Sequence, residues 1–172
     1  MTTVLTTTTN AGGVYTFTNL MPGDYFVGFR VPAGYAASPR DVGSDDAADS
    51  DADPQTGQTV STTLTAGEND PTWDLGLYEP ASLGDTVWYD LNKDGTRDAG
   101  DLGMPGVEMV LYDINGSPLL TSTTDANGLY LFEALEPGTY SVGFQLPPNF
   151  EFTALDLGGD DSADSDVDPT VN

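Results

Sequence analysis

The sequence has neither cysteine nor histidine, and only four of its 172 residues are lysine or arginine. Without cysteine and histidine the chain can form no disulfide, no zinc site built from the usual ligands and no nucleophile paired with an imidazole base. Its 28 acidic residues bring the net charge to -24, which repels a polyanion. These absences exclude most enzyme classes and argue against nucleic-acid binding.

Long hydrophobic runs are also missing from the sequence. No stretch reaches the roughly 18 apolar residues of a membrane helix, and Met1 is followed by threonines rather than by a basic and an apolar segment. We therefore expect no membrane insertion, and no export signal within these residues. The hydrophobic content of 38%, with 10% aromatic residues, is nevertheless sufficient for packed cores.

The acidic residues are mostly aspartate: 22 are aspartate and only 6 are glutamate. Aspartate is typical of loops and turns, because its short side chain places an oxygen close to its own backbone. The same property suits compact oxygen cages around a hard cation. The composition therefore favours calcium binding in loops.

An internal repeat organises the chain. Residues 1–57 align without a gap onto residues 116–172, at an offset of 115, and 26 of the 57 aligned positions are identical. A unit of about 115 residues is an ordinary domain size, so the chain holds about one and a half repeats. With a break near Glu79-Pro80, we predict that residues 1–79 are the C-terminal part of a first repeat and residues 80–172 the N-terminal part of a second.

The local sequence predicts strands throughout. Short segments rich in threonine, valine, tyrosine and phenylalanine alternate with turn signals, and helical periodicity is not sustained. Asn115-Gly116 and Asn127-Gly128 predict tight turns between such segments. This pattern predicts an all-β sandwich. The expected strands are Val4–Thr9, Val14–Thr18, Asp24–Val31, Gln58–Leu64, Trp73–Tyr78, Thr86–Tyr89, Val107–Asp113, Leu119–Thr124, Leu129–Phe132 and Thr139–Leu146.

Residues 90–101, DLNKDGTRDAGD, have the ligand spacing of an EF-hand loop. Alternate residues of such a curled loop point oxygens inward, and glycine at the sixth position permits the sharp turn. The flanking segments are predicted as strands, so the loop is expected without the helices of an EF-hand; a solvated acidic hairpin is the alternative. The predicted calcium ligands are Asp90, Asn92, Asp94, the backbone carbonyl of Thr96, Asp98 and Asp101.

A second acidic motif occurs twice, as SDDAADSDADP at residues 44–54 and GDDSADSDVDP at residues 159–169. Each copy packs five carboxylates into nine residues, which is repulsive unless a cation lies among them. Every aspartate recurs while neighbouring residues differ, so the motif predicts a second kind of calcium site, with a solvated acidic loop as the alternative. Its predicted ligands are Asp45, Asp46, Asp49, Asp51, Asp53, Asp160, Asp161, Asp164, Asp166 and Asp168.

Four segments follow one another in the order of a known family: SLGDTVWYDLNKDGTRDAGDLGMPGVEMVLYD, TTDANGLYLFEALEPGTYSVGF, DDSADSDVDP and, in the other copy, TWDLGLYEP. With these motifs the chain resembles the SdrD B-type repeats of bacterial surface proteins, which are relatives of the Cna-B domains. The resemblance covers essentially the whole chain. It implies tandem Greek-key β-sandwiches that bind several calcium ions per repeat and serve as stiff extracellular spacers.

The function expected from these observations is a non-catalytic, calcium-stabilised structural repeat of a secreted microbial surface protein. Such a repeat would be a spacer in a stalk or a building block of an extracellular filament. An adhesive module for a glycan or a host protein is the alternative, and it would require an exposed aromatic or apolar patch. A dockerin-like module would need a helix after Asp101, where Gly103, Pro105 and Gly106 argue against one.

The partial repeats also predict partners. Each half of the chain lacks strands that the other half has, and an unpaired sheet edge is a template for another strand. We therefore expect contacts with neighbouring repeats or with copies of the chain itself. Because the two ends differ, such an assembly would run head to tail. The alternative is that the chain is a window of a longer tandem array.

Overall fold

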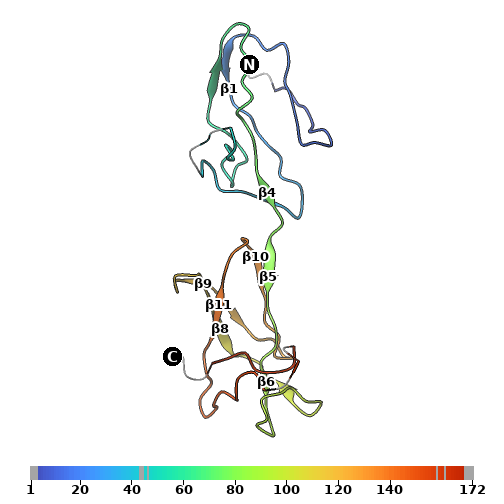
Figure 1. Ribbon diagram of the computed structural model, residues 1–172, viewed down its shortest axis with the longest axis vertical. Helices are drawn as coiled ribbons and strands as arrows, with labels where there is room; N and C mark the ends of the chain where they lie inside the picture. The colour runs from blue at the N-terminus through green and yellow to red at the C-terminus, as the bar shows by residue number, and fades with distance from the viewer. Residues whose placement is uncertain (1–3, 43–44, 46, 158, 161, 169–172) are drawn as a thin grey trace. The chain divides into compact units, whose positions relative to one another are not determined.

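The computed structural model describes residues 4–42, 45, 47–157, 159–160 and 162–168. The chain divides into two compact units, Met1–Glu79 (unit 1) and Pro80–Asn172 (unit 2), each treated separately below (Figure 1). Strands, turns and extended segments make up these described residues, and none of them forms a helix that could cross a membrane. The predicted all-β class is confirmed.

Unit 2 is built from small antiparallel sheets. The largest places β8 between β9 and β11, while β5 pairs with β10 and β6 with β7. After β9 the chain moves to the second sheet as β10 and returns as β11 beside β8, a sheet-switching path of the Greek-key kind. The strands are β5 (Ala81–Leu83), β6 (Trp88–Tyr89), β7 (Leu102–Gly103), β8 (Glu108–Tyr112), β9 (Pro118–Thr123), β10 (Phe132–Leu135) and β11 (Ser141–Phe144).

The predicted hairpin turn at Asn115-Gly116 is confirmed as the connection between β8 and β9. One carboxylate oxygen of Asp113 accepts hydrogen bonds from the amides of Asn115, at 2.9 Å, and Ser117, at 2.8 Å. Gly116 adopts φ of 78°, a left-handed conformation that glycine takes without steric cost. The aspartate that precedes the Asn-Gly pair therefore fixes the register of the hairpin.

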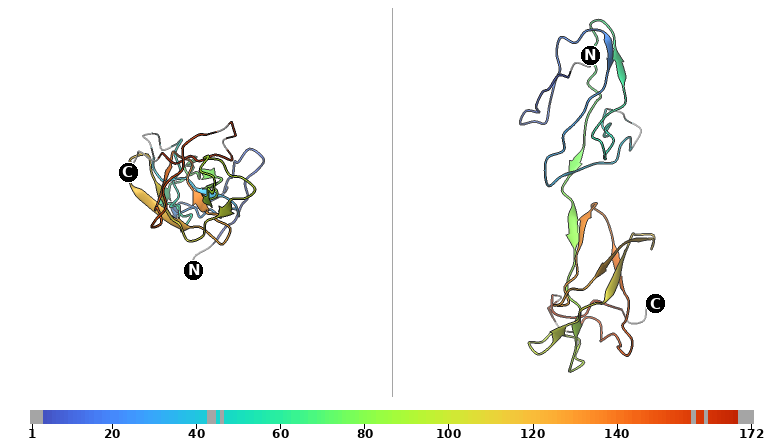
Figure 2. Two further views of the ribbon diagram at one scale, coloured as in Figure 1. Left: turned by 90° about the horizontal axis from the view of Figure 1, so that it is seen from below. Right: turned by 180° about the vertical axis from the view of Figure 1, so that it is seen from behind.

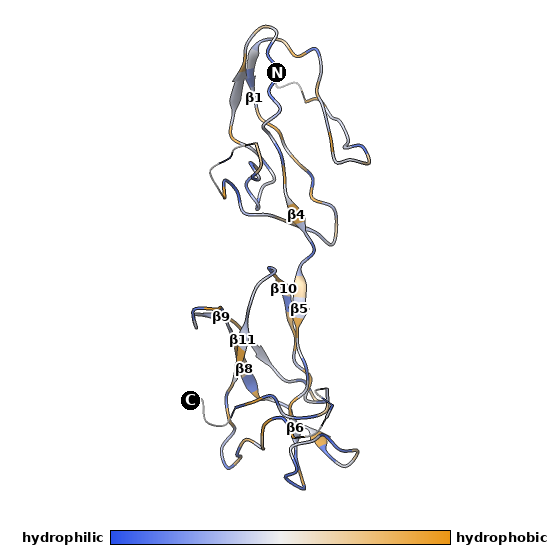
Figure 3. Cartoon of the chain, viewed as in Figure 1, coloured by the Kyte–Doolittle hydropathy of each residue, from blue (hydrophilic) through white to orange (hydrophobic). Residues whose placement is uncertain are grey.

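The core of unit 2 lies between its two main sheets. Alternate residues of β8 point inward, and Met109 and Leu111 are completely buried. They pack with Phe132 and Leu135 of β10, and β5 and β11 contribute further apolar side chains. Figure 2 shows the two sheets from other directions, and in Figure 3 β5 and part of β8 are coloured as apolar. Unit 2 is thus a small β-sandwich.

Unit 1 has shorter regular elements. β1 (Gly23–Tyr25) pairs with β3 (Thr62–Leu64), and β2 (Ala36–Ala37) pairs with β4 (Leu77–Tyr78), both antiparallel. The β1–β3 ladder continues as an isolated bridge between Gly28 and Gln58. Unit 1 therefore contains two strands, β3 and β4, that follow its copy of the acidic motif in the sequence.

The same aromatic packing occurs in both units. The ring of Tyr15 lies edge-on to Phe17 and Phe29, with centroid distances of 6.0 and 5.5 Å. Tyr130 makes the same two contacts with the phenylalanines 115 positions further along, at 6.0 and 5.8 Å. The sequence repeat is therefore also a repeat of side-chain packing, in which these aromatic residues are half-buried or, for Phe132, buried.

Several strand predictions were wrong. Val4–Thr9 and Val14–Thr18 are extended but unpaired, whereas the counterpart of the first segment in unit 2 forms β9 because it pairs with β8. The strand expected at Leu129–Phe132 begins only at Phe132, and the ladder is interrupted near Ala134, which has φ of 57°. The short strands β2, β5 and β7 were not predicted. Pairing partners, rather than local propensity, decide these cases.

The buried β8 residues should dominate the stability of unit 2. Leu111→Ala removes a side chain with 0% exposure and should lower the free energy of unfolding by about 2 to 5 kcal/mol. Leu102→Ala is the matched control, because Leu102 is 72% exposed and should change stability by less than about 0.5 kcal/mol. Urea unfolding of both variants measures the difference. Equal effects would contradict the core described here.

Candidate functional site

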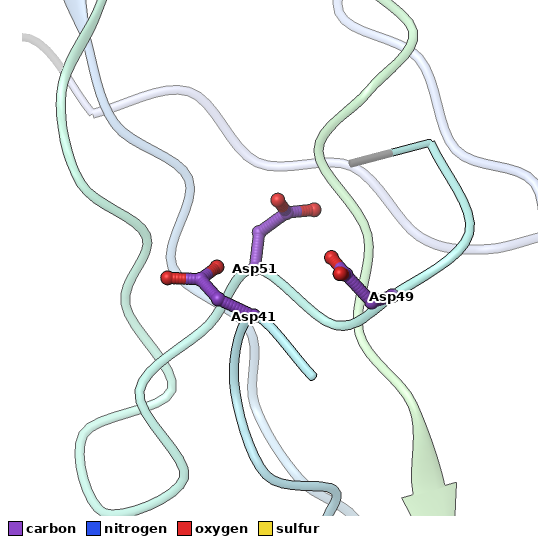
Figure 4. Close-up of side chains that lie close together, drawn as sticks. All are labelled: Asp41, Asp49 and Asp51. Atoms are coloured by element: carbon purple, nitrogen blue, oxygen red, sulfur yellow. The ribbon is translucent and has the colours of Figure 1, made fainter. Parts of the chain in front are cut away.

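Each unit gathers three aspartates into one cluster. One carboxylate oxygen from each member lies within 4.8 Å of the others in the set Asp41, Asp49 and Asp51 (triad 1), and likewise in the set Asp156, Asp164 and Asp166 (triad 2). The two triads occupy equivalent positions of the repeat, 115 residues apart. Figure 4 shows the side chains of triad 1 around a shared space. Three carboxylate oxygens at this spacing suit a hard divalent cation.

A short parallel bridge assembles each triad. In unit 1, Arg40 pairs with Ser50, and the Asp41 amide donates to the Ser50 carbonyl at 2.9 Å. In unit 2 the Asp156 amide donates in the same way to the Ser165 carbonyl at 3.0 Å. The first aspartate of each triad has positive φ, 53° and 50° respectively. This turn brings it opposite the two aspartates that flank the serine.

Each triad buries a different carboxylate. In triad 1 Asp51 is 3% exposed, and its carboxylate accepts a hydrogen bond of 2.6 Å from the Asp74 amide. In triad 2 Asp164 is 8% exposed, and its Oδ1 atom is buried with no hydrogen-bond partner among the described residues. A buried charged oxygen without a partner is costly. A cation at triad 2 would satisfy that oxygen.

The loop of residues 90–101 (the acidic loop) curls so that three predicted ligands converge. The Asn92 side-chain amide donates to Asp94 Oδ2 at 2.8 Å and to Asp98 Oδ2 at 3.1 Å. The Asp101 carboxylate closes the loop by accepting from the amides of Leu91, at 3.1 Å, and Asp98, at 2.9 Å. Positions 3, 5 and 9 of the loop are therefore close together, but among the described residues three carboxylate oxygens lie within 4.8 Å of one another only in the two triads.

Asp90 anchors the acidic loop to the rest of unit 2. Its carboxylate accepts hydrogen bonds from the Lys93 amide at 2.6 Å, the Gly95 amide at 2.9 Å and the Thr153 hydroxyl at 2.6 Å. Burial alone would raise the pKa of Asp90, but these hydrogen bonds outweigh it and lower the pKa below its usual value. Asp90 therefore stays ionised at neutral pH.

Gly95 allows the acidic loop to lie directly on the segment that carries Asp156. Gly95 has φ of 80°, and a Cβ atom there would lie 2.8 Å from the Ala154 carbonyl oxygen and 3.2 Å from Leu157 Cβ. A larger residue would force the two segments apart. The glycine that the EF-hand spacing places at the sixth position thus has a second role in packing.

The acidic loop is also joined by its backbone to the motif that supplies Asp164 and Asp166. We call these contacts the loop ladder. They are an antiparallel bridge between Thr96 and Asp164, a bond of 2.7 Å from the Arg97 amide to the Ala163 carbonyl, and a bond of 3.1 Å from the Ser165 amide to the Gly95 carbonyl. The two kinds of predicted calcium site, far apart in the sequence, are therefore neighbours in unit 2.

Other predicted ligands stabilise turns instead of joining a triad. Asp53 Oδ1 accepts hydrogen bonds from the amides of Gln55 and Thr56, which lower its pKa. Asp160 Oδ1 accepts from the hydroxyl of Ser162 at 2.6 Å, and Asp45 begins the equivalent turn of unit 1. These aspartates are placed beside the triads, where they add negative charge.

The remaining predicted ligands are Asp46, Asp161 and Asp168. The first two lie outside the described residues, and Asp168 is not a member of triad 2. Asp41 and Asp156, in contrast, were missed by sequence reasoning. Both are among the identical positions of the repeat, so their recurrence was the signal that could have found them.

The triads create a negative potential at the edge of each core. Burial and then the charges of Asp85 and Asp166 raise the pKa of Tyr130 to about 12. Burial and then the charges of Asp51 and other nearby aspartates raise the pKa of Tyr15 in the same way. Each tyrosine is therefore held in its neutral form beside carboxylates that few cationic side chains neutralise.

The anchoring of Asp90 predicts a pH dependence in metal-free buffer. Because its folded-state pKa is lowered, its contribution to stability is present above the unfolded pKa of about 4 and is lost as the pH falls through the folded value. Thr153→Val should therefore destabilise by about 1 kcal/mol at neutral pH, with a smaller effect once the pH has fallen below the folded pKa of Asp90. Urea unfolding at several pH values measures this.

Thr121→Val is the control for that experiment, since Thr121 is exposed on β9. It should show no comparable pH dependence. A Thr153→Val effect that is constant from pH 7 to pH 2 would show that the hydroxyl does not act through the Asp90 carboxylate.

Comparison with known proteins agrees with this architecture. The SdrD B-like domain family matches residues 1–77 and 81–172. The chain is 42% identical over 165 residues to serine-aspartate repeat-containing protein F of Staphylococcus epidermidis, covering 95% of the chain and 9% of that protein. It is 41% identical over 169 residues to serine-aspartate repeat-containing protein C of Staphylococcus aureus strain Newman, covering 96% of the chain and 17% of that protein. The chain belongs to the SdrD B-like domain family.

Proposed function

We infer that this chain is a calcium-stabilised structural repeat of a secreted surface protein, acting as a spacer in a stalk or as a building block of an extracellular filament. The observation that carries the proposal is the buried Asp164 Oδ1, which lies in triad 2 and has no hydrogen-bond partner among the described residues. The same triad recurs in unit 1. Two equivalent clusters of this kind favour a cation at each.

Calcium is the cation that this chemistry favours. The donors are carboxylate, amide, hydroxyl and backbone oxygens, and the chain has no histidine or cysteine to attract a softer metal. The triads supply oxygens from flexible turns, which suits the variable geometry of calcium better than the strict octahedron of magnesium. The acidic loop adds a further candidate calcium position in unit 2.

A structural role follows from which segments the sites connect. Triad 1 ties Asp41 to the segment of Asp49 and Asp51, and the acidic loop lies against residues 153–157 and 163–165. The apolar cores are small, with only Met109 and Leu111 fully buried among the large side chains of the described residues. Bound cations would thus supply cross-links that the core alone does not, and would relieve the repulsion of a chain with net charge -24.

The neighbours of each unit in this proposal are further repeats, or copies of the chain arranged head to tail. The chain spans 9 to 17% of the length of the relatives reported above, which leaves room for other repeats in a protein of that kind. An array of this kind would hold other domains apart outside the cell. It would do so through its length and stiffness, without catalysis.

An adhesive module is the second candidate, and exposed leucines of unit 2 favour it. Leu119 and Leu120 of β9, and Leu129 and Leu131 before β10, are between 45% and 51% exposed. These side chains are aliphatic, so they would suit a protein partner better than a glycan, which stacks on aromatic rings. A spacer needs no such partner. If the chain is an adhesive module, substitution of these leucines should abolish binding to a host ligand; if it is a spacer, there is no such binding to lose.

Removal of calcium should destabilise the chain. Sites saturated at 100 to 1,000 times their dissociation constant add about 3 to 4 kcal/mol each, so excess EDTA should lower the melting temperature by several degrees or more. Asp164→Asn should remove one bound ion in calorimetric titration and reduce the calcium-dependent stabilisation. Glu133→Gln is the control of equal charge change, and it should leave the ion count unaltered.

If EDTA leaves the melting temperature of the wild-type chain unchanged, the calcium proposal fails. An Asp164→Asn variant that retains every ion would instead show that triad 2 is a solvated acidic cluster. The remaining ions would then have to be assigned to the acidic loop and triad 1.

The spacer role predicts calcium-dependent mechanical strength. In single-molecule stretching, the force that unfolds unit 2 should fall when calcium is replaced by EDTA, because the cross-links between the acidic loop and residues 153–157 and 163–165 lose their cations. Chains in calcium and in magnesium at the same ionic strength provide the comparison. Equal unfolding forces in calcium and EDTA would argue against a mechanical function and favour the adhesive one.

A further inference from the structure

We propose that the acidic loop and triad 2 bind their cations cooperatively through the loop ladder, whereas triad 1 binds independently of both. The proposal rests on the calcium function above and adds how its sites regulate one another. The two triads contact different segments: Thr96 of the acidic loop is bridged to Asp164 of triad 2, whereas in triad 1 the Asp51 carboxylate accepts a hydrogen bond from the Asp74 amide.

The coupling begins with shared backbone. Thr96 of the acidic loop bridges Asp164 of triad 2, and Arg97 and Ser165 add hydrogen bonds of 2.7 and 3.1 Å on either side of that bridge. Ordering these residues costs conformational entropy. Whichever site is loaded first orders these residues, so the second cation binds to a segment that is already in place.

A second connection reaches the third member of triad 2. The Thr153 hydroxyl donates to Asp90 at 2.6 Å, and Gly95 packs against Ala154 and Leu157, which flank Asp156. The acidic loop therefore touches both strands of the short parallel bridge that assembles triad 2. Closing the loop fixes Asp156 as well as Asp164.

Burial supplies independent support for a ligand at triad 2. Asp164 is 8% exposed, and its Oδ1 atom has no hydrogen-bond partner among the described residues. The acidic loop contacts this residue directly, because Thr96 is bridged to Asp164 itself.

Charge opposes this cooperativity, because a cation at one site weakens the attraction of the other site for a second cation. The acidic loop has four carboxylates together with Lys93 and Arg97, so one divalent cation neutralises it, whereas the three carboxylates of triad 2 keep one negative charge. The proposed cooperativity therefore requires that the ordering effect outweighs the repulsion. An ordinary coupling free energy corresponds to about a 5- to 150-fold change in affinity.

The chain contains its own control. Triad 1 has the same three aspartates on the same bridge, but it contacts the Asp74 segment, with hydrogen bonds of 2.6 and 3.1 Å between Asp51 and Asp74. A change in the acidic loop of unit 2 should therefore leave triad 1 unaffected. Any general effect of net charge or buffer would alter both triads together.

The test is a calcium titration of the full 172-residue chain, followed by NMR at the amides of Asp51, Asp166 and Gly95, which report the three sites separately. Asp94→Ala removes a ligand of the acidic loop. It should weaken triad 2 by about 5- to 150-fold and leave the affinity of triad 1 unchanged. By reciprocity, Asp166→Ala should weaken the acidic loop by the same factor as Asp94→Ala weakens triad 2.

A second pair of variants tests the ladder without changing any carboxylate. Arg97→Pro removes the amide that donates to the Ala163 carbonyl, and an extended residue such as the bridged Thr96 is compatible with a following proline. Arg97→Ala loses the same side chain but keeps the amide. Arg97→Pro should weaken both the acidic loop and triad 2, whereas Arg97→Ala should resemble the wild type.

The outcomes separate this inference from the function on which it rests. If all three sites bind calcium in the wild type and triad 2 keeps its affinity in Asp94→Ala, the coupling is refuted while the calcium function stands. Equal weakening of triad 1 and triad 2 also refutes it, because the effect would then be general. If no site responds to calcium in the wild type, the proposed function itself fails.

Discussion

The convergence of carboxylates is the constraint on which the rest of this structure depends. Each unit holds three aspartate oxygens within 4.8 Å of one another, and one aspartate of each triad is almost completely buried. The chain has four cationic side chains against 28 acidic ones, and the Arg40–Asp41 pair of 3.2 Å is the ion pair found among the described residues. Arg40 therefore pairs with one member of triad 1, and hydrogen bonds hold the buried Asp51 and Asp164 to distant segments of their units.

Asp51 of triad 1 and Asp164 of triad 2 occupy equivalent positions of the repeat, and each is held by a distant segment of its own unit. The Asp51 carboxylate accepts a hydrogen bond from the Asp74 amide, and Asp164 is bridged to Thr96 of the acidic loop. Each triad is therefore joined by hydrogen bonds to a segment that lies far from it in the sequence.

Much of the candidate site could be predicted from the sequence, because the patterns are local. The EF-hand spacing of residues 90–101 fixes a turn at Gly95 and directs the side chains of Asn92, Asp94 and Asp98 toward one another. Recurrence of the DSDxD motif marked Asp49 and Asp51 and their counterparts. Asp41 was missed because its place in triad 1 depends on a bridge to Ser50, and nothing in its immediate neighbours indicates that pairing.

The sequence by itself determined the repeat, the turns and the all-β class, since each is set by residues near one another along the chain. Asp113 and Gly116, for example, fix their hairpin through local hydrogen bonds and a backbone conformation. Only the tertiary structure decided which extended segments become strands and which aspartates meet. Val4–Thr9 and its counterpart in β9 have similar residues, yet only the second is a strand, because a ladder needs a partner and β8 supplies it. The loop ladder likewise could not be predicted from the sequence. It consists of backbone hydrogen bonds between distant segments, and such bonds do not depend on a recognisable pattern of side chains.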